Sequence, residues 1–257
     1  MMLSMLSAVV IVKNEERNIV DCLDSIDFCQ EIIVVDDYSS DRTPEILDRL
    51  SKENVKIKIF KRKLDSDFSA QRNYGVEKTT FDWVLFVDAD ERITKELAVE
   101  IEDNLSLPDF GGFLILRVDY IWGKLLRHGE TGNVKLLRLF NKNKGSLKGN
   151  VHEVWQTKSK VGVLANPIKH YPHPTISEFL NEINFYTDLR AEELYKKKVK
   201  SNFFSIVLFT KAKFIQDYFL KMGFLDGKEG FIHAVIMSFH SFLVRGKLWL
   251  LWQKNSA

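Results

Sequence analysis

Runs of hydrophobic residues alternate with amphipathic stretches through the first half of the chain. Four short runs predict strands: Leu6–Val12, Ile32–Val35, Val55–Phe60 and Trp83–Val87. Three of them are almost wholly apolar, as strands buried on both faces of a parallel sheet are, whereas Val55–Phe60 alternates with lysines. Helical spacing of apolar residues begins near Ile19, Thr43 and Asp67, between these runs. The order predicts an α/β fold with a mostly parallel central sheet and helices on both faces.

The second half predicts a few more strands and then only helices. A helix begins at Thr94, strands are expected at 113–118, 134–140 and 161–164, and loops at 141–149 and 168–174. Thr175 and Glu178 predict a capping box at the start of a long helix, and two more helices, near 203–222 and 228–252, flank a turn at 223–227. We expect a domain at 1–175, with halves at about 1–105 and 106–175, and a C-terminal helical extension at 176–257.

Charge is distributed unevenly along the chain. The net charge is only +2, but from Tyr186 to Ala257 there are 12 lysines and arginines against 6 acidic residues. This basic part is also rich in Phe, Leu and Trp, which favours contact with an anionic membrane surface over nucleic acid. A solvated helical face, a helical core and a dimer face remain alternative interpretations of the same residues.

Sequence features also indicate the cell compartment. The two cysteines, Cys22 and Cys29, are too few for a disulfide framework and suggest reduced thiols. The first seven residues lack the basic and long apolar stretches of a signal peptide, and no run of about 18 apolar residues predicts a membrane-spanning helix. We therefore expect a cytoplasmic protein with at most peripheral membrane contact.

The apolar run at Trp83–Val87 ends abruptly in the carboxylates Asp88, Asp90 and Glu91. Burying carboxylates without partners is costly, so they must lie where the strand leaves the sheet, and ligands bind at this edge of α/β sheets. Two carboxylates spaced in this way can hold a divalent cation that in turn holds phosphate oxygens. The alternative is an acid-rich turn before a helix. Because neither G-x-G-x-x-G nor a P-loop occurs, a bound nucleoside diphosphate would need such a metal.

Four motifs occur in a specific order: Val9–Glu16, Ile33–Thr43, Ala70–Gly75 and Val87–Glu91. Val151-His152-Glu153 and Ile168–Tyr171 follow in the second half. With these motifs the chain resembles the family 2 glycosyltransferases of the GT-A fold, from about Leu6 to Thr175. With the turn Gly223–Gly227, it is similar to the bacterial subgroup that builds lipopolysaccharide core and related surface glycans.

The resemblance implies an inverting transfer of glucose or another hexose from a UDP-sugar to a hydroxyl of a surface-glycan acceptor. It implies Mn²⁺ or Mg²⁺ as cofactor, with Asp90 contacting the metal directly and Asp88 meeting the ribose or the metal's water shell. His170 matches the position of a further metal ligand, and His173 is a competing candidate. A loop histidine bonded to the backbone is the simpler alternative.

The resemblance also assigns the remaining site residues. Glu153 matches the catalytic base, with His152 orienting it or touching the acceptor; otherwise the two are a surface pair. Asp36 is expected to accept the uracil N–H, unless it only forms a turn, and Arg72 to reach the diphosphate or the base, unless it forms a surface ion pair. The resemblance also assigns nucleotide-sugar binding to Val12, Asn14, Glu15 and Ala89.

The chain departs from the family pattern at two places. Lys13-Asn14 replaces a common Thr or Ser, and Tyr38 replaces a common Gly or Cys. A sugar nucleotidyltransferase is an alternative, but it would need a glycine-rich basic loop where the acidic Lys13–Glu16 stands. A non-catalytic carbohydrate-binding or assembly protein is another. We expect the inner face of the bacterial plasma membrane as the place of action; the sequence does not indicate an oligomeric state.

Overall fold

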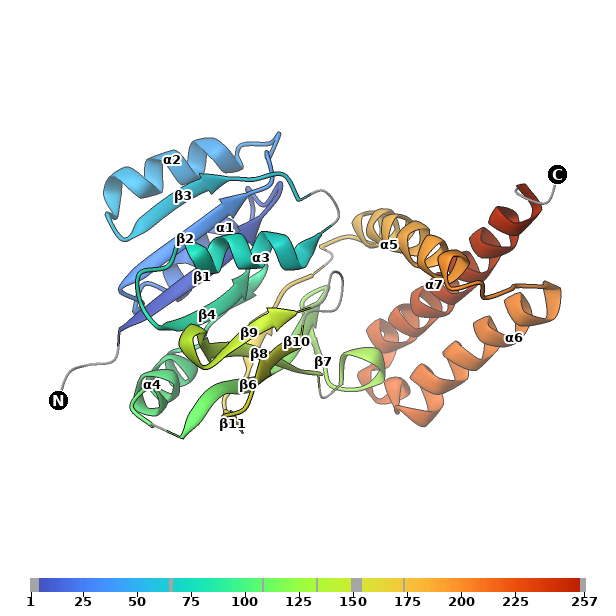
Figure 1. The fold of residues 1–257 in the computed structure, drawn as a ribbon. Coiled ribbons are helices and arrows are strands. Elements are labelled where there is room, and N and C mark those ends of the chain that lie inside the picture. Colours follow the sequence, from blue (N-terminus) through green and yellow to red (C-terminus); the bar gives the residue numbers. More distant parts are fainter. Residues whose placement is uncertain are drawn as a thin grey trace. The chain divides into compact units, whose positions relative to one another are not determined.

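A computed structural model describes residues 5–64, 67–107, 109–132, 134–148, 154–172 and 174–254. Within it the chain forms two compact units (Figure 1). Unit 1 comprises Met1–Arg117 and Val134–His170, and unit 2 comprises Val118–Asn133 and Tyr171–Ala257. Unit 1 contains the central sheet and unit 2 the C-terminal helices.

The first half of unit 1 forms a four-stranded parallel sheet in the order β3-β2-β1-β4. Its strands are β1 (Leu6–Val12), β2 (Glu31–Asp36), β3 (Ile57–Lys61) and β4 (Trp83–Asp88). The helices between and after them are α1 (Ile19–Ser25), α2 (Thr43–Glu53), α3 (Phe68–Glu77) and α4 (Lys95–Asn104). The predicted α/β fold is therefore confirmed.

Alternate residues of these strands pack on opposite faces of the sheet, as the two-residue period of a strand requires. Ala8 and Val10 of β1 pack in one core with residues of α1, α2 and α4. Val9 packs in a second core with Tyr74 and Val76 of α3. Gly75 makes the close approach of α3 possible, because a Cβ there would lie 2.5 Å from Cγ1 of Val9. Helices therefore cover both faces of the sheet.

Later strands extend the sheet with antiparallel pairing. Strand β8 (Val134–Asn141) pairs with β4 and with β6 (Phe110–Ile121), and β11 (Lys160–Val163) runs parallel to β6. The short strands β5 (Glu91–Arg92) and β12 (Ile168–His170) pair antiparallel. Two predicted loops therefore contain strands: β12 begins the second loop, and β9 (Gly145–Lys148), paired with β10 (Val154–Thr157), lies in the first.

Unit 2 is built from three helices and the segment at 118–133. The helices are α5 (Ile176–Lys196), α6 (Phe203–Phe214) and α7 (Gly227–Lys254). The helix predicted near 203–222 is α-helical only in its first part. After α6 it continues as a π-helix, η3 (Ile215–Leu220), and the 3₁₀ turn η4 (Gly223–Asp226) follows. The remaining elements of the unit are β7 (Lys124–Leu126) and the 3₁₀ turn η1 (Gly129–Thr131); η2 (Lys142–Lys144) belongs to unit 1.

Within the described residues, one helix, Gly223–Lys254, is long and apolar enough to cross a membrane by length and composition. It passes on average hydropathy although scattered polar residues interrupt its apolar run, so the expectation that no helix spans a membrane stays a prediction. One face of this helix is occupied inside unit 2. Val244 and Leu248 pack against Ala191 and Leu194 of α5.

Candidate active site

The loops after β1 and β2 are joined by hydrogen bonds. Asn14 has the left-handed φ of 56°, and its backbone N–H donates to Oγ of Ser39 at 2.9 Å. Its side-chain Oδ1 accepts from the backbone N–H of Ser40 at 2.8 Å. The N–H of Glu15 donates to Oγ1 of Thr43, at 2.8 Å, so this hydroxyl ties the two loops together at the start of α2. Because Asp36 and Val12 are paired in register, these bonds frame one edge of the sheet.

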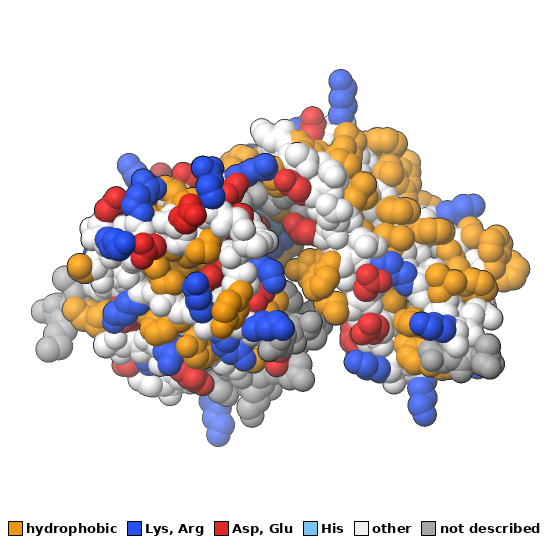
Figure 2. Space-filling view, turned by 90° about the horizontal axis from the view of Figure 1, so that it is seen from above, with side chains coloured by type: hydrophobic (Ala, Val, Ile, Leu, Met, Phe, Trp, Pro, Cys, Tyr) orange, Lys and Arg blue, Asp and Glu red, His pale blue; other side chains and the backbone are white. Residues whose placement is uncertain are grey.

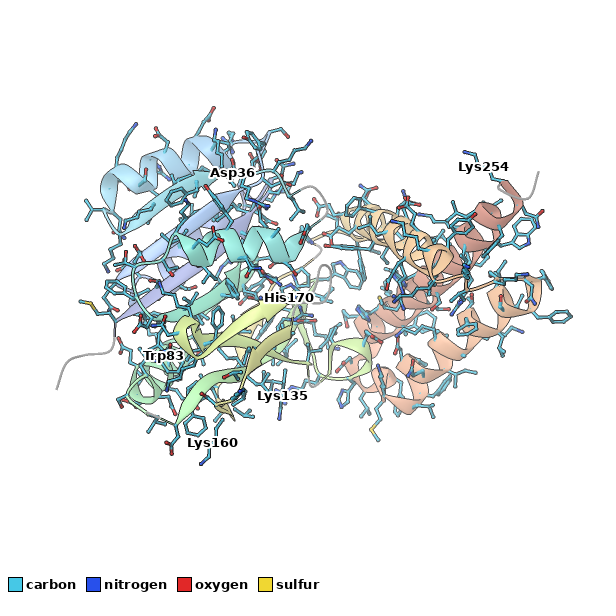
Figure 3. All side chains as sticks on the ribbon, viewed as in Figure 1. Asp36, Trp83, Lys135, Lys160, His170 and Lys254 are labelled. Carbon is cyan, nitrogen blue, oxygen red and sulfur yellow. The ribbon has the colours of Figure 1, made fainter. Side chains whose placement is uncertain are left out.

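Asp36 is the last residue of β2, and within the described part of the chain its buried carboxylate has only one oxygen in hydrogen bonds. Oδ1 accepts from the backbone N–H of Ser39 at 3.0 Å and from its hydroxyl at 2.6 Å. Oδ2 has no hydrogen-bond partner among the residues that the structure describes. A buried acceptor without a partner costs free energy, and such a group calls for a ligand or a structural reason. Figure 3 shows Asp36 at the end of the sheet opposite Trp83, which begins β4.

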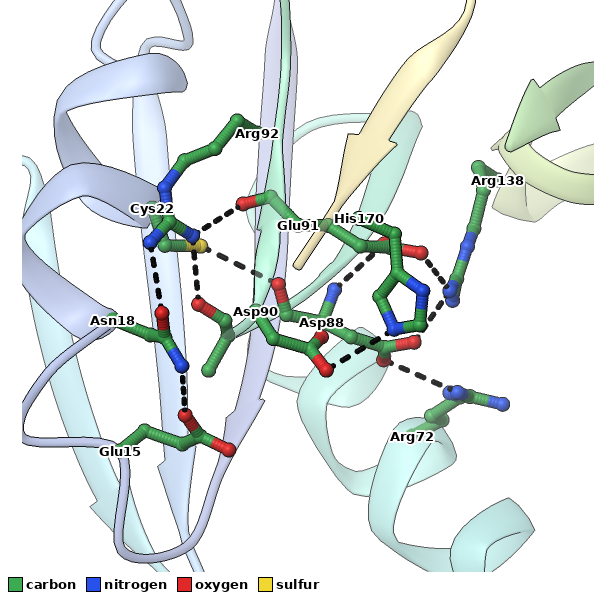
Figure 4. Close-up of polar contacts among 11 residues, drawn as sticks. Glu15, Asn18, Cys22, Arg72, Asp88, Asp90, Glu91, Arg92, Arg138 and His170 are labelled. Atoms are coloured by element: carbon green, nitrogen blue, oxygen red, sulfur yellow. Dashed lines mark hydrogen bonds and ion pairs between the residues drawn. The ribbon is translucent and has the colours of Figure 1, made fainter. Parts of the chain in front are cut away.

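Two arginines form ion pairs with the carboxylate of Asp88 at the end of β4 (Figure 4). Nη2 of Arg138 contacts Oδ2 at hydrogen-bond distance, and Nη2 of Arg72 lies 3.3 Å from Oδ1. Burial alone would raise the pKa of Asp88, but the two guanidinium groups outweigh it and hold this pKa well below its usual range. Asp88 is therefore an anion fixed by arginines, and Arg72 reaches the site from α3.

Glu91 lies behind Asp88 and is completely buried. Its Oε1 accepts from Nη2 of Arg138 at 2.6 Å, and its Oε2 accepts from the backbone N–H of Asp88 at 3.0 Å. Burial raises the pKa of Glu91, against the opposing effect of Arg138. Arg138 thus bridges both ends of the acidic motif and fixes the turn between them.

Asp90, in the same turn, contacts His170 (Figure 4). Nε2 of His170 lies 3.1 Å from Oδ2 of Asp90. The two residues are 80 positions apart in the sequence, and the pairing of β12 with β5, which sets His170 opposite Glu91, brings them together. Both side chains are partly exposed, at 12% for His170 and 25% for Asp90.

The donor atoms of Asp90 and His170 fit a divalent cation that takes its other ligands from phosphate and water. Mg²⁺ in such sites is commonly held by one or two carboxylates plus substrate phosphates, and imidazole is a common ligand of transition metals. No group of three or more His, Cys, Asp or Glu able to hold a metal occurs among the described residues. Asp88 is engaged by its arginines, so we expect a direct ligand role for Asp90 rather than for Asp88.

The structure shows where some of the predicted site residues lie, and their roles stay predictions. It brings Asp88, Ala89, Asp90 and His170 together, and the carbonyl of Ala89 accepts from Nη1 of Arg92 at 3.0 Å. Val12, Asn14, Glu15 and Asp36 lie at the ends of the neighbouring strands. The predicted base Glu153, its neighbour His152, and the competing ligand His173 lie outside the described residues.

Sequence reasoning missed Arg138 and gave Glu91 no role. A signal was present, because Arg138 is a charged residue inside the apolar run Val134–Phe140. A charge on a strand between two others can be buried only if it is paired. The sequence did not name the partner, because Asp119 and Glu130 lie nearer to Arg138 along the chain than Asp88 and Glu91 do.

Comparisons with known proteins give a consistent result. The family model described as glycosyl transferase family 2 matches residues 7–161. The lipopolysaccharide core biosynthesis glycosyltransferase LpsC of Rhizobium meliloti is 26% identical, over 95% of this chain and 92% of that protein. An uncharacterized glycosyltransferase of Rickettsia typhi is also 26% identical, over 95% of this chain and 86% of that protein. The crystal structure of Staphylococcus aureus TarS 1–349 in complex with UDP has a TM-score of 0.45 at 15% identity, covering 98% of this chain and 92% of that chain.

Proposed function

The chain belongs to glycosyl transferase family 2, and on this basis we propose that it is an inverting, metal-dependent hexosyltransferase. Its donor is a UDP-sugar, and its acceptor is a hydroxyl of lipopolysaccharide core or a related surface glycan. The similarity to a lipopolysaccharide core biosynthesis enzyme along nearly the whole chain supports the acceptor class. Family membership argues against a sugar nucleotidyltransferase, and the glycosyltransferases among the relatives support an enzyme over a non-catalytic protein on the same fold.

The observation that carries the proposal is the unpartnered Oδ2 of Asp36. A uracil ring presents one N–H on the edge that a carboxylate at a strand end can reach. A hydrogen bond from it would satisfy the buried acceptor and would be charge-assisted, so it would be stronger than a neutral one. The loop of Asn14 is already held by hydrogen bonds to Ser39 and Ser40. Because Oδ2 of Asp36 is itself buried, the atoms that cover it would have to move to admit the base.

The diphosphate would lie between the base pocket and the Asp90–His170 pair. Asp90 and His170 would hold the metal, which when bound neutralises the negative charge that grows on the leaving diphosphate. Arg72 lies beside this position on α3, ion-paired with Asp88. Arg138 and Glu91 keep the Asp88–Asp90 turn in one geometry, so that the carboxylate of Asp90 is positioned before the donor arrives.

We assign the base to Glu153. The acceptor oxygen attacks the anomeric carbon, the bond from that carbon to the diphosphate oxygen breaks, and Glu153 takes the hydroxyl proton. His152 would orient this carboxylate or touch the acceptor. We also propose that the protein acts in the cytoplasm, in peripheral contact with the inner face of the plasma membrane, where a lipid-linked acceptor would be presented.

Nucleotide binding with defined variants tests the donor site. UDP with Mn²⁺ should raise the melting temperature of the wild-type protein. Asp90→Asn should lose the part of this shift that depends on Mn²⁺, whereas Asp82→Asn, an exposed carboxylate before the same strand, should keep it. The absence of any shift with uridine, guanosine or thymidine diphosphates and metal would overturn the donor-site proposal.

Transfer with a defined variant tests the base. Glu153→Gln should keep the UDP and Mn²⁺ shift but lose sugar transfer to a lipopolysaccharide-core acceptor, because the amide cannot take the proton. Turnover equal to that of the wild type would assign the base to another residue.

A further inference from the structure

Helix α6 is apolar but buries none of its side chains. Phe203 and Phe204, at its start, are 72% and 80% exposed. The helix is stabilised locally by a capping box, in which Asn202 and Ser205 exchange hydrogen bonds of 2.8 Å. Large exposed apolar patches on soluble proteins mark sites of interaction with a partner or a membrane. Figure 2 shows hydrophobic side chains gathered on the surface of unit 2.

The exposed side chains form two stripes with helical spacing. One follows α6 and η3 and comprises Phe204, Leu208, Ile215 and Phe219; the other follows α7 and comprises Phe231, Val235, Phe239 and Phe242. The stripes are linked by aromatic rings. Phe214 and Tyr218 each contact both Phe219 and Phe231, at centroid distances between 5.1 and 6.2 Å. The apolar surface is therefore continuous from one helix to the other.

The surface includes a groove between η3, η4 and the first turns of α7. It has a volume of about 560 Å³ and is lined by Tyr218, Phe224, Gly227, Lys228, Phe231 and Ile232. The turn beside it is tightly packed, because a Cβ on Gly230 would lie 2.1 Å from the carbonyl oxygen of Gly223. The groove thus lies at a tightly packed turn, which we call the tip, and one lysine, Lys228, lines it together with aromatic side chains.

Helices α6 and α7, with η3 and η4 between them, form a hairpin whose acidic and basic side chains differ in burial. Its acidic residues point inward: Asp217 is buried next to Lys213 and Lys221, and Asp226 is buried and accepts from the backbone N–H groups of Arg127 and His128. Glu229 pairs with Lys124. The exposed charged residues of the described part of 203–254 are Lys211, Lys228 and Lys254. The exposed charged side chains of this part are therefore all lysines, and Glu229, which is partly exposed, is neutralised by its ion pair with Lys124.

We propose that the α6–α7 hairpin binds the surface of an anionic lipid bilayer. The aromatic side chains of the tip enter the acyl region, and Lys211 and Lys228 meet lipid phosphates at its edge. Apolar side chains bordered by lysines are what such an interface selects. A second copy of the same face would bring these lysines together, which disfavours a symmetric dimer. Because its other face packs on α5, α7 lies along the bilayer rather than across it.

The inference rests on the proposed function only for its purpose, which is to hold the enzyme next to a lipid-linked acceptor. It is tested by sedimentation of the full-length protein with vesicles of phosphatidylcholine, alone or with about a third phosphatidylglycerol. The wild type should bind the anionic vesicles and bind the neutral ones at least about tenfold more weakly, since each lysine near the surface adds attraction.

Two variants with matched controls locate the surface. Lys211→Glu with Lys228→Glu should weaken binding to anionic vesicles by about tenfold or more, whereas Lys52→Glu with Lys95→Glu, on unit 1, should not. Phe219→Ser with Phe224→Ser should also abolish binding, whereas Phe185→Ser, an exposed phenylalanine on α5, should not. The charge variants alter only exposed side chains, so they remain informative if the phenylalanine variants fail to fold.

The possible outcomes are distinct. Sedimentation that is equal for variants and controls, or no binding to anionic vesicles, would overturn the membrane surface. The proposal would also be overturned if the wild type were a dimer in solution that does not bind vesicles and the phenylalanine variant were a monomer. UDP binding in vesicle-free buffer should be the same in all variants. A wild type that binds vesicles but no UDP would contradict the donor site and leave the lipid surface supported.

Discussion

Asp36→Asn should separate nucleotide binding from folding stability. The substitution keeps an oxygen that can accept from the N–H and hydroxyl of Ser39, at the distances of 3.0 and 2.6 Å that Oδ1 of Asp36 has now. It replaces the unpartnered Oδ2 by an NH₂ group. The NH₂ group is a hydrogen-bond donor, and so is the uracil N–H. The two would face each other without forming a hydrogen bond.

The magnitudes follow from these contacts. A hydrogen bond to a charged group contributes about 1.5–3 kcal/mol, so the Kd for UDP should rise by about 10- to 150-fold. The free energy of unfolding without ligand should change by less than about 1 kcal/mol, because one partnerless buried polar atom replaces another. Asp37→Asn is the matched control. Both oxygens of Asp37 are bonded within the chain, to Lys13 and to the N–H of Leu64, at 2.7 and 2.9 Å.

Calorimetric titration with UDP and Mn²⁺, together with urea unfolding, distinguishes the two variants. Asp37→Asn should lower the free energy of unfolding by about 1 kcal/mol and leave the Kd for UDP unchanged. Asp36→Asn should show the reverse pattern. A Kd for UDP in Asp36→Asn equal to that of the wild type would refute the role of Oδ2 as the base acceptor.

Three further substitutions test the scaffold. Arg138→Met should lower the free energy of unfolding by about 3–5 kcal/mol in urea titrations, because Glu91 stays buried without its cation; a loss below about 1 kcal/mol would contradict the bridge. Gly75→Ala should lower the melting temperature through its clash with Val9, at a cost of about 1–3 kcal/mol, and a rise would contradict it. The pKa of Glu31 is lowered from 4.5 to about 2: burial would raise it, but hydrogen bonds from lysine, serine and threonine side chains and a backbone N–H lower it more. The stabilisation that ionised Glu31 provides is thus complete above about pH 4.5 and is lost as the pH falls towards 2. Glu31→Gln should therefore make the free energy of unfolding in urea depend less on pH in that window. An unchanged pH dependence in the variant would exclude this effect.

The parallel half of the sheet could be predicted because its strands carry their own signal. Trp83–Val87 is apolar on both faces, and Asp88 marks where the strand leaves the core. The strand β9 has no such signal. Gly145–Lys148 contains one apolar residue, and its pairing with β10 is a long-range property that a local pattern does not contain. The π-helix was missed for a related reason, because its residues keep the apolar spacing of an ordinary helix.

The acidic motif could be located from the sequence, but its internal geometry could not. The family resemblance gave Asp90 a direct contact with the metal and Asp88 a contact with the ribose or the metal's water shell, but it gave no physical reason for the difference. Their difference depends on Arg138, which lies 50 residues after Asp88 and approaches from an antiparallel strand. Pairing over that distance depends on the register of β8 against β4, which is set by the whole sheet.

The pairing of β5 with β12 has a consequence for the order in which the protein folds. Only two residues of β5 hold His170 beside Asp90, and 80 residues of chain must be closed into a loop for this contact. Contacts of large sequence separation form late, because the entropy of loop closure is lost before the contact stabilises anything. The four parallel strands are complete at Asp88, so a nascent chain can form the strand ends of the proposed nucleoside pocket long before Asp90 and His170 meet. If the proposed site is correct, the protein would pass during synthesis through a form that has the base pocket but not yet the metal ligands.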